Sequence, residues 1–229
     1  LNLNVRRGEI LGIAGIDGNG QTELAEIITG LRKATKGEVL VGGFDVCNRS
    51  PRVGFEHGVS SIPADRQKHG LVLEFSVAEN MILQNFREPE FSSHGILKKD
   101  AIVEHAKQAV EKYDIRPNGC ENRPAGTLSG GNQQKVIIAR EVGNDKDLLI
   151  AVNPTRGLDV GAIEYVHRYL VEQRNKGKAV LLVSFELDEI LSLSDRIDTI
   201  YDGRIVGSMR GCDVDENTLG LLMAGGKHA

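Results

Sequence analysis

Residues 9–24 read EILGIAGIDGNGQTEL, and the fold is decided by this stretch. The apolar run EILGIAG (9–15) is typical of a buried strand, and it leads directly into a glycine-rich turn. A helix is predicted at 22–31. Its apolar side chains recur at helical spacing: Leu24, Ile27, Ile28 and Leu31. Strand, glycine-rich turn and helix in this order are typical of a phosphate-binding loop, whose backbone N–H groups hold an anion.

The candidate nucleotide-binding loop consists of Gly15, Ile16, Asp17, Gly18, Asn19, Gly20, Gln21 and Thr22. Spaced glycine pairs occur by chance in a chain with 27 glycines, so the flanking strand and helix carry this interpretation. Thr22 stands where such loops place the hydroxyl that binds Mg²⁺. Gln21 stands where they place a lysine, and it offers an amide donor but no charge, while Asp17 adds a carboxylate nearby. We therefore expect weak nucleotide binding through the backbone and Thr22; a tight turn without a ligand is the alternative.

The bulk composition is that of an ordinary globular protein. The 229 residues are 40% hydrophobic and 26% charged, with a net charge of −4, which gives no electrostatic footprint for nucleic acid. The three cysteines show no metal-binding spacing, so we expect a reducing, cytosolic setting. LNLNV (1–5) is expected to be a strand, and we expect the chain to be a fragment whose own first strand precedes Leu1.

Short apolar strands alternate with helical patterns, which predicts an α/β fold with a largely parallel sheet. Further strands are expected at 37–43, 58–63, 147–153 and 179–185, and a hairpin with an Asp-Gly turn at 198–207. A helix is predicted at 98–113, and another short one near 218–226. One face of the first is apolar: Ile102, Ala106, Ala109, Val110 and Tyr113.

TLSGGNQQK (127–135) is the most informative stretch of the chain. Ser129 is a good N-cap residue, and the residues after the two glycines are helical, so this is a second helix N-terminus that can bind an anion. A glycine-rich turn with no ligand is the alternative. Two other features argue against that alternative: a phosphate-loop pattern lies upstream, and LLIAVNPTRGLDVGA (148–162) follows downstream.

At this point the sequence resembles the nucleotide-binding domain of ABC transporters. LSGGNQQK resembles the ABC signature motif, IAVNPTRGLD the Walker B segment with its D-loop, and LLVSFELDEI the switch segment. GIDGNGQTEL, IPADRQKHGLVLEFSVAENMIL, PTRGLDVGA and GLLMAGG resemble the second domain of the tandem ATP-binding subunits of simple-sugar and nucleoside importers, the nucleoside branch most closely.

The resemblance implies a P-loop NTPase core with a mostly parallel sheet, a helical subdomain and a small antiparallel β portion at the N-terminal side. It implies a single domain over 1–229, with its core at 1–75 and 128–229 and its helical subdomain at about 76–127. The signature positions are Leu128, Ser129, Gly130, Gly131, Asn132 and Gln133. The D-loop position is Asp159.

Several positions depart from the ABC pattern. The Walker B acids, which hold Mg²⁺ and polarise the attacking water, are replaced by Val152 and Asn153. The switch histidine is replaced by Phe185, and the Q-loop glutamine or glutamate by Ala64. Together with Gln21, these changes remove the cation, both carboxylates and the γ-phosphate sensor. We expect no catalytic residue in cis and therefore no useful ATP hydrolysis at this domain's own Walker face.

The signature face, by contrast, is complete, and the resemblance implies a use for it. ABC domains pair head to tail, with each ATP held between one P-loop and the other domain's signature, so this chain is expected to complete a partner's site. Expected ligands are ATP or ADP with Mg²⁺, weak in cis and shared at the dimer interface. Expected partners are a second ABC domain, membrane-spanning permease subunits docking near 63–66 and 76–81, and indirectly an extracellular solute receptor. The expected location is the cytoplasmic face of the membrane.

Two rival interpretations belong to other classes. A soluble ABC ATPase of DNA repair or translation needs coiled-coil arms, zinc cysteines or basic patches, which the sequence between Thr22 and Leu128 lacks. A purely structural P-loop fold would bind no nucleotide and no partner, and the intact signature argues against it. An active importer ATPase domain is the remaining alternative.

Overall fold

The computed structural model describes residues 1–226, so residues 227–229 of the expected 1–229 domain lie outside the described residues. The chain divides into two compact units. The first comprises Leu1–Ser61, Lys146–Pro154 and the residues from His167 onward, and the second comprises Ile62–Asp145 and Thr155–Val166. The second unit contains all of the residues expected as a helical subdomain, 76–127.

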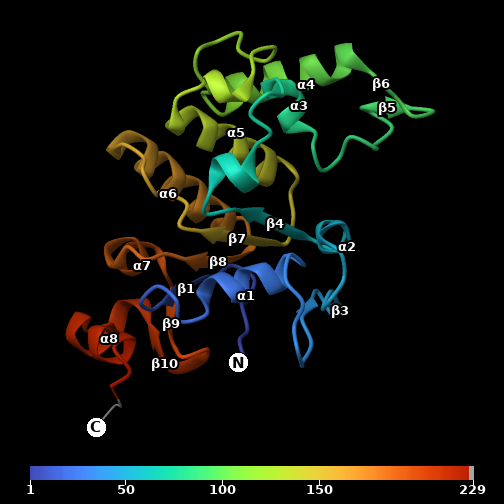
Figure 1. Ribbon diagram of the computed structural model, residues 1–229. Coiled ribbons are helices and arrows are strands. Elements are labelled where there is room, and N and C mark those ends of the chain that lie inside the picture. Colours follow the sequence, from blue (N-terminus) through green and yellow to red (C-terminus); the bar gives the residue numbers. More distant parts are fainter. Residues whose placement is uncertain (227–229) are drawn as a thin grey trace. The chain divides into compact units, whose positions relative to one another are not determined.

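A six-stranded sheet forms the framework of the first unit (Figure 1). Its strands lie in the order β10 (Arg204–Arg210), β9 (Arg196–Tyr201), β1 (Ile10–Ala14), β8 (Ala179–Val183), β7 (Leu148–Val152) and β4 (Val59–Ile62). β1 runs parallel to both β8 and β9, and β7 runs parallel to β8, while β10, the hairpin partner of β9, is antiparallel to it. The predicted α/β class with a mostly parallel sheet is confirmed.

The central strands of this sheet are buried along their whole length. Every residue of β1 and of β8 is buried, as expected for parallel strands that read as continuous apolar runs. Around them lie α1 (Gln21–Ile28), α2 (Pro51–Glu56), α7 (Leu187–Leu193), η3 (Gly211–Asp213) and α8 (Glu216–Met223). The small antiparallel portion is the hairpin of β2 (Leu40–Val41) and β3 (Phe44–Asp45).

The second unit is mostly helical. Its core is formed where α3 (Val77–Met81) and α5 (Gly130–Gly143) pack together and α4 (Lys99–Lys112) packs on α3. The elements are the π-helix η1 (Arg66–Gly70), α3 (Val77–Met81), β5 (Ser92–Ser93), β6 (Ile96–Leu97), α4 (Lys99–Lys112), the 3₁₀ turn η2 (Ala125–Thr127) and α5 (Gly130–Gly143). α6 (Val160–Asn175) begins in this unit and ends in the first. The apolar face predicted for 98–113 is confirmed, since all five of its side chains are buried.

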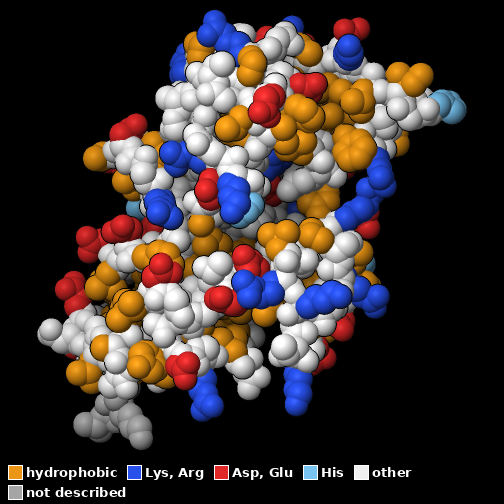
Figure 2. Space-filling model, viewed as in Figure 1, with side chains coloured by type: hydrophobic (Ala, Val, Ile, Leu, Met, Phe, Trp, Pro, Cys, Tyr) orange, Lys and Arg blue, Asp and Glu red, His pale blue; other side chains and the backbone are white. Residues whose placement is uncertain are grey.

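Local signals explain where these elements begin and end. The hairpin predicted at 198–207 is confirmed, and Asp202 and Gly203 both have positive φ, as a two-residue type I′ turn requires. Ser76 begins α3 with a capping box in which Ser76 and Glu79 bond each other's backbone N–H groups. On the face in Figure 2, acidic and basic side chains are interspersed.

Three expectations about local structure are wrong. Residues 1–5 form no strand, because no described strand pairs with them, and the Asn4 carbonyl instead accepts from Arg196 Nη2. The helix predicted at 22–31 ends at Ile28, because Gly30 takes a left-handed conformation that closes the helix, and Leu31 is left 67% exposed. The strand expected at 37–43 is only Leu40–Val41, since the two following glycines turn the chain.

Candidate functional site

The phosphate-loop frame lies in the first unit, between the end of β1 and the start of α1. Gly18 and Gly20 have φ of 88° and 108°, a conformation that glycine adopts without strain. Asn19 ties the loop to the β9–β10 turn, because its Oδ1 accepts from Asp202 N and its backbone oxygen from Gly203 N, both at 2.9 Å. The predicted strand, loop and helix are therefore all present, and the loop has a fixed shape.

Gln21 lies inside this loop rather than at its surface. Its side chain is only 1% exposed, and its Nε2 donates to the carbonyl of Ile16 at 3.1 Å. Oε1 of the same side chain is buried with no hydrogen-bond partner among the described residues. A Cβ on Gly15 would lie 2.6 Å from Nε2, so only glycine leaves room for this arrangement. The Gln21 amide, which the sequence pattern places where the phosphates would bind, thus donates to the backbone of its own loop.

The end of β7 carries an amide where the ABC pattern has carboxylates. Asn153 is buried, its φ is 43°, and its Oδ1 accepts from Phe185 N at 3.0 Å. Asparagine tolerates such a backbone better than most residues. The Phe185 ring stays 37% exposed, and the Val152 side chain is buried. This arrangement ties the ends of β7 and β8 together and presents neither an acid nor an imidazole.

These residues fit one part of a Mg-nucleotide and not another. The backbone of the loop and the side chain of Thr22, an exposed residue, fit a phosphate and a weakly held cation. Gln21, Val152 and Asn153 supply neither the positive charge nor the carboxylate that tight binding and water activation need. Within residues 1–226, no group of three or more His, Cys, Asp or Glu side chains is arranged to hold a metal ion.

The signature stretch lies in the second unit and forms the start of α5. Ser129 is the N-cap of this helix, as predicted, and its Oγ accepts from the backbone N of Asn132 at 3.4 Å and from Asn132 Nδ2 at 2.9 Å. Gln133 is buried, and its Nε2 donates to the carbonyls of Ala125 and Leu128. Both side chains therefore stabilise the turn that leads into the helix.

The two signature glycines allow two other segments to approach closely. A Cβ on Gly130 would lie 2.8 Å from Arg66 Nη2, and a Cβ on Gly131 would lie 3.3 Å from the Cβ of Ala162. Arg66 Nη1 in turn donates to the carbonyl of Arg156 at 2.9 Å. Arg66 thus connects the start of α5 to the segment that ends at the predicted D-loop position.

That D-loop position is the cap of α6. The Oδ1 of Asp159 accepts from Ala162 N at 2.9 Å. The segment before Arg66 is also fixed: Asp65 caps η1, and hydrogen bonds from the Lys68 and Gln67 backbone keep the pKa of its carboxyl below the usual value. Ala64, at the predicted Q-loop position, offers only a methyl group there.

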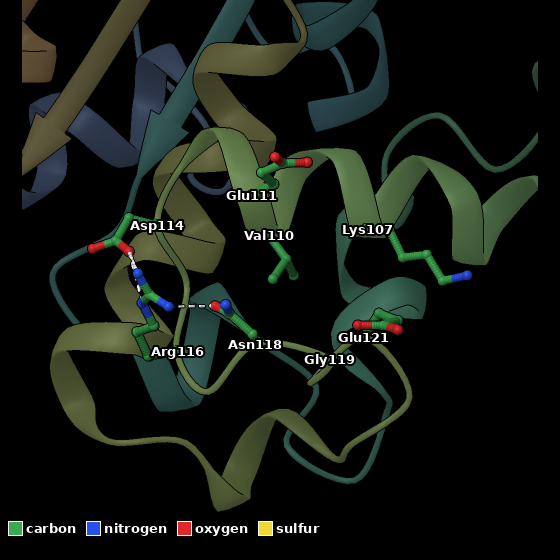
Figure 3. A pocket seen from close by; sticks show the side chains of 8 residues that line it. All are labelled: Lys107, Val110, Glu111, Asp114, Arg116, Asn118, Gly119 and Glu121. Carbon is green, nitrogen blue, oxygen red and sulfur yellow. Dashed lines mark hydrogen bonds and ion pairs between the residues drawn. The ribbon is translucent and has the colours of Figure 1, made fainter.

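A loop at 114–118 is attached to α5 by two side chains of the signature stretch. Asn132 Oδ1 accepts from Arg116 N at 2.7 Å, and Lys135 Nζ donates to the Asp114 carbonyl at 2.7 Å and to its Oδ2 at 3.0 Å. The Lys135 hydrogen bond lowers the pKa of the Asp114 carboxyl. Arg116 also bonds Asp114 and Asn118, and this side of the loop borders a hollow of about 330 Å³ (Figure 3).

Comparison with known proteins gives these features a family. A family model described as ABC transporter matches residues 1–156. The chain belongs to the ABC transporter family.

Curated relatives of this ABC domain are ATP-binding proteins of importers. It is 53% identical to the guanosine import ATP-binding protein NupO of Bacillus subtilis, over 98% of this chain and 44% of that protein. It is 52% identical to the nucleoside import ATP-binding protein NupA of Lactococcus lactis, over 99% and 44%. The chain thus spans less than half the length of either relative. A solved structure of MJ1267, an ATP-binding cassette of an ABC transporter, matches with a TM-score of 0.78 at 25% identity, covering 97% of this chain and 89% of that one.

Sequence reasoning missed four residues of this ABC domain that organise the signature. Arg66 and Arg156 are 90 positions apart in the sequence, so no local pattern signals their contact. Arg116 reaches Asn132 through its backbone N–H, which carries no sequence signal at all. Lys135 could have been found, because it lies three positions after Asn132 and therefore on the same face of the helix. Among residues 1–226, the ABC domain has no helix that is long and apolar enough to cross a membrane.

Proposed function

We propose that this chain is an ABC domain of an importer for nucleosides or simple sugars, whose own Walker face is catalytically degenerate and whose signature completes a partner's ATP site. One contrast carries the proposal. The cap, the glycine contacts and the supporting side chains of the signature are all formed, while Gln21 bonds the loop's own backbone and Asn153 replaces a carboxylate. The relatives named for guanosine and nucleoside import support the substrate class.

The proposed mechanism divides the work between two ABC domains. The start of α5 offers N–H groups and the Ser129 hydroxyl, which stabilise negative charge on a terminal phosphate held by the partner. Asp159 lies near the paired surface and helps to couple the two sites. In cis, the loop 15–22 and Thr22 hold a Mg-nucleotide weakly and do not cleave it.

The surroundings of the domain complete the proposal. A second ABC domain, in the same full-length protein, supplies the lysine, the acids and the switch histidine. Membrane-spanning permease subunits dock near 63–66 and 76–81, beside the helical subdomain at about 76–127. An extracellular receptor delivers the solute, and the domain lies on the cytoplasmic face of the membrane.

Two matched variants of the assembled complex test this division. Ser129→Arg should abolish both ATP turnover and uptake, because the side chain fills the space of the partner's phosphate. Thr22→Val should retain most of the turnover, because the hydroxyl serves only this domain's own, non-hydrolytic site. Thermal unfolding of each variant shows whether the fold is retained.

Full ATP turnover by Ser129→Arg together with loss of turnover in Thr22→Val would contradict the proposal. So would an ordinary rate of ATP hydrolysis by this chain alone, which would make it an active importer ATPase domain. Calorimetry gives a third check, since submicromolar affinity of the chain for Mg-ATP would contradict the weak site in cis.

A further inference from the structure

The hydroxyl of Ser129 is used as an acceptor on its inner side. Its Oγ receives the backbone N–H of Asn132 at 3.4 Å and the Nδ2 amide of the same residue at 2.9 Å. A serine hydroxyl has two acceptor lone pairs and one O–H donor. Because Oγ already accepts two hydrogen bonds from Asn132, the O–H donor is the group of Ser129 that can bind a ligand. Ser129 is exposed.

The orientation of the Asn132 amide is fixed from the other side. Its Oδ1 lies 2.7 Å from the backbone N of Arg116, and a backbone N–H can only donate. Turning the amide over would place an NH₂ group against that N–H, so Nδ2 must face Ser129. The hydrogen-bond network therefore fixes the orientation of the Asn132 amide between Arg116 and Ser129.

Arg116 is itself held in place. Its guanidinium donates to Asp114 Oδ1 at 2.7 Å and to Asn118 Oδ1 at 2.6 Å (Figure 3). Asp114 in turn accepts from Lys135 of α5. The loop that supplies the fixed N–H is thus attached to the same helix that carries Asn132. Asn132 and Lys135, three positions apart, hold it together.

We propose that Asn132 is a positioning residue that fixes the Ser129 hydroxyl as an outward hydrogen-bond donor to the terminal phosphate of a nucleotide bound by the partner domain. The proposal rests on the proposed function of the signature in trans. Ser129 donates outward because Asn132 donates to its Oγ. Reversing that hydrogen bond would turn the Ser129 O–H inward, toward residue 132.

Asn132→Asp reverses the bond with little change of shape. One carboxylate oxygen still accepts from Arg116 N, while the other faces Ser129 and takes its O–H. ATP turnover of the complex that contains this chain and its partner is measured for Ser129→Ala, for Asn132→Asp and for the double variant. Asn118→Asp is the matched control, because it adds the same charge to the neighbouring loop without a hydrogen bond to Ser129.

Each single variant should lower kcat by about 10- to 100-fold, the effect of one hydrogen bond to a charged group. KM for ATP should change much less, because the donor acts mainly on charge that develops during the reaction. The double variant should be no worse than Ser129→Ala alone, because both changes remove the same donor. Asn118→Asp should stay within about twofold of the unmodified complex.

Losses that add in the double variant would overturn the proposal, since added charge alone would then explain Asn132→Asp. Unchanged kcat in Asn132→Asp, with Ser129→Ala impaired, would overturn it and leave the proposed function standing. Unchanged kcat in Ser129→Ala would overturn both the role of Asn132 and the proposed function of the signature. Should Asn132→Asp fail to fold, Asn132→Leu replaces it: a smaller loss, again absent in the Ser129→Ala background, is expected, and an additive loss would overturn the proposal.

Discussion

Gln21 donates its side-chain amide to the carbonyl of Ile16, so the loop that should receive a phosphate is bonded by its own glutamine. The donor is buried, and its companion Oε1 has no partner in the described chain. A buried polar atom without a partner costs about 1–3 kcal/mol, so this arrangement persists because the loop is held from elsewhere. Asn19 and the β9–β10 turn provide that support.

Gln21→Lys should strengthen Mg-ATP binding to this chain by about 10- to 100-fold, because hydrogen bonds to charged groups contribute about 1.5–3 kcal/mol. Isothermal titration calorimetry measures the dissociation constant for Mg-ATP. Gln21→Met, which removes the amide without adding charge, is the control and should show no gain. Equal tightening in both variants would mean that loss of the Ile16 bond, and not charge, governs binding.

Asn153→Ala should lower the free energy of unfolding by about 1–3 kcal/mol, because the Phe185 N–H loses its acceptor and alanine disfavours a φ of 43°. Urea unfolding monitored by circular dichroism measures the change. Asn153→Asp keeps an acceptor and tolerates the backbone, so its loss should be smaller. A larger loss for aspartate than for alanine would contradict this account.

Gly130→Ala should have different effects on stability in two backgrounds. In the unmodified chain the new methyl group displaces the Arg66 guanidinium and its bond to Arg156, which offsets alanine's better helix propensity. In an Arg66→Ala background nothing is displaced, and the same change should stabilise by about 0.5–1 kcal/mol. Unfolding free energies of the four proteins measure the difference, and equal effects in both backgrounds would refute the contact.

The ion pair of Asp114 and Lys135 predicts a pH dependence. Because the pKa of Asp114 is lowered in the folded chain, its contribution to stability is present above the unfolded pKa, about 4, and is lost as pH falls through the folded pKa. Asp114→Asn should therefore be less stable than the unmodified chain at pH 7, and the gap should close on acidification. Lys135→Met should reproduce only part of the gap, because Arg116 still bonds the Asp114 carboxylate, and the double variant should lose less than the sum of the two single changes. A gap that persists in strong acid would contradict the pair.

Local patterns predicted those parts of the fold that depend on neighbouring residues. Buried strands, the apolar face of α4, the Ser129 cap and the Asp202–Gly203 turn follow from periodicity and from backbone preferences of single residues. LNLNV alternated correctly but had no strand to pair with, and Leu31 had the right spacing on the wrong side of Gly30.

The candidate site divides in the same way. Sequence identified its two glycine-rich frames and the positions with unusual residues. It could not identify what those residues bond, because Gln21 bonds backward within its loop and Arg66 and Arg116 contact residues distant in sequence. Whether a side chain donates or accepts a hydrogen bond depends on its partner, and the fold determines which partner lies beside it.

The bond between Asn19 and Asp202 joins residues 183 positions apart. β1, which leads into the same loop, likewise has both of its neighbours, β8 and β9, near the other end of the chain. A ribosome therefore releases the glycine loop long before the segments that shape it exist. During synthesis the loop and its strand must wait unpaired, and the nascent chain can acquire its nucleotide-binding frame only when the last hairpin has emerged.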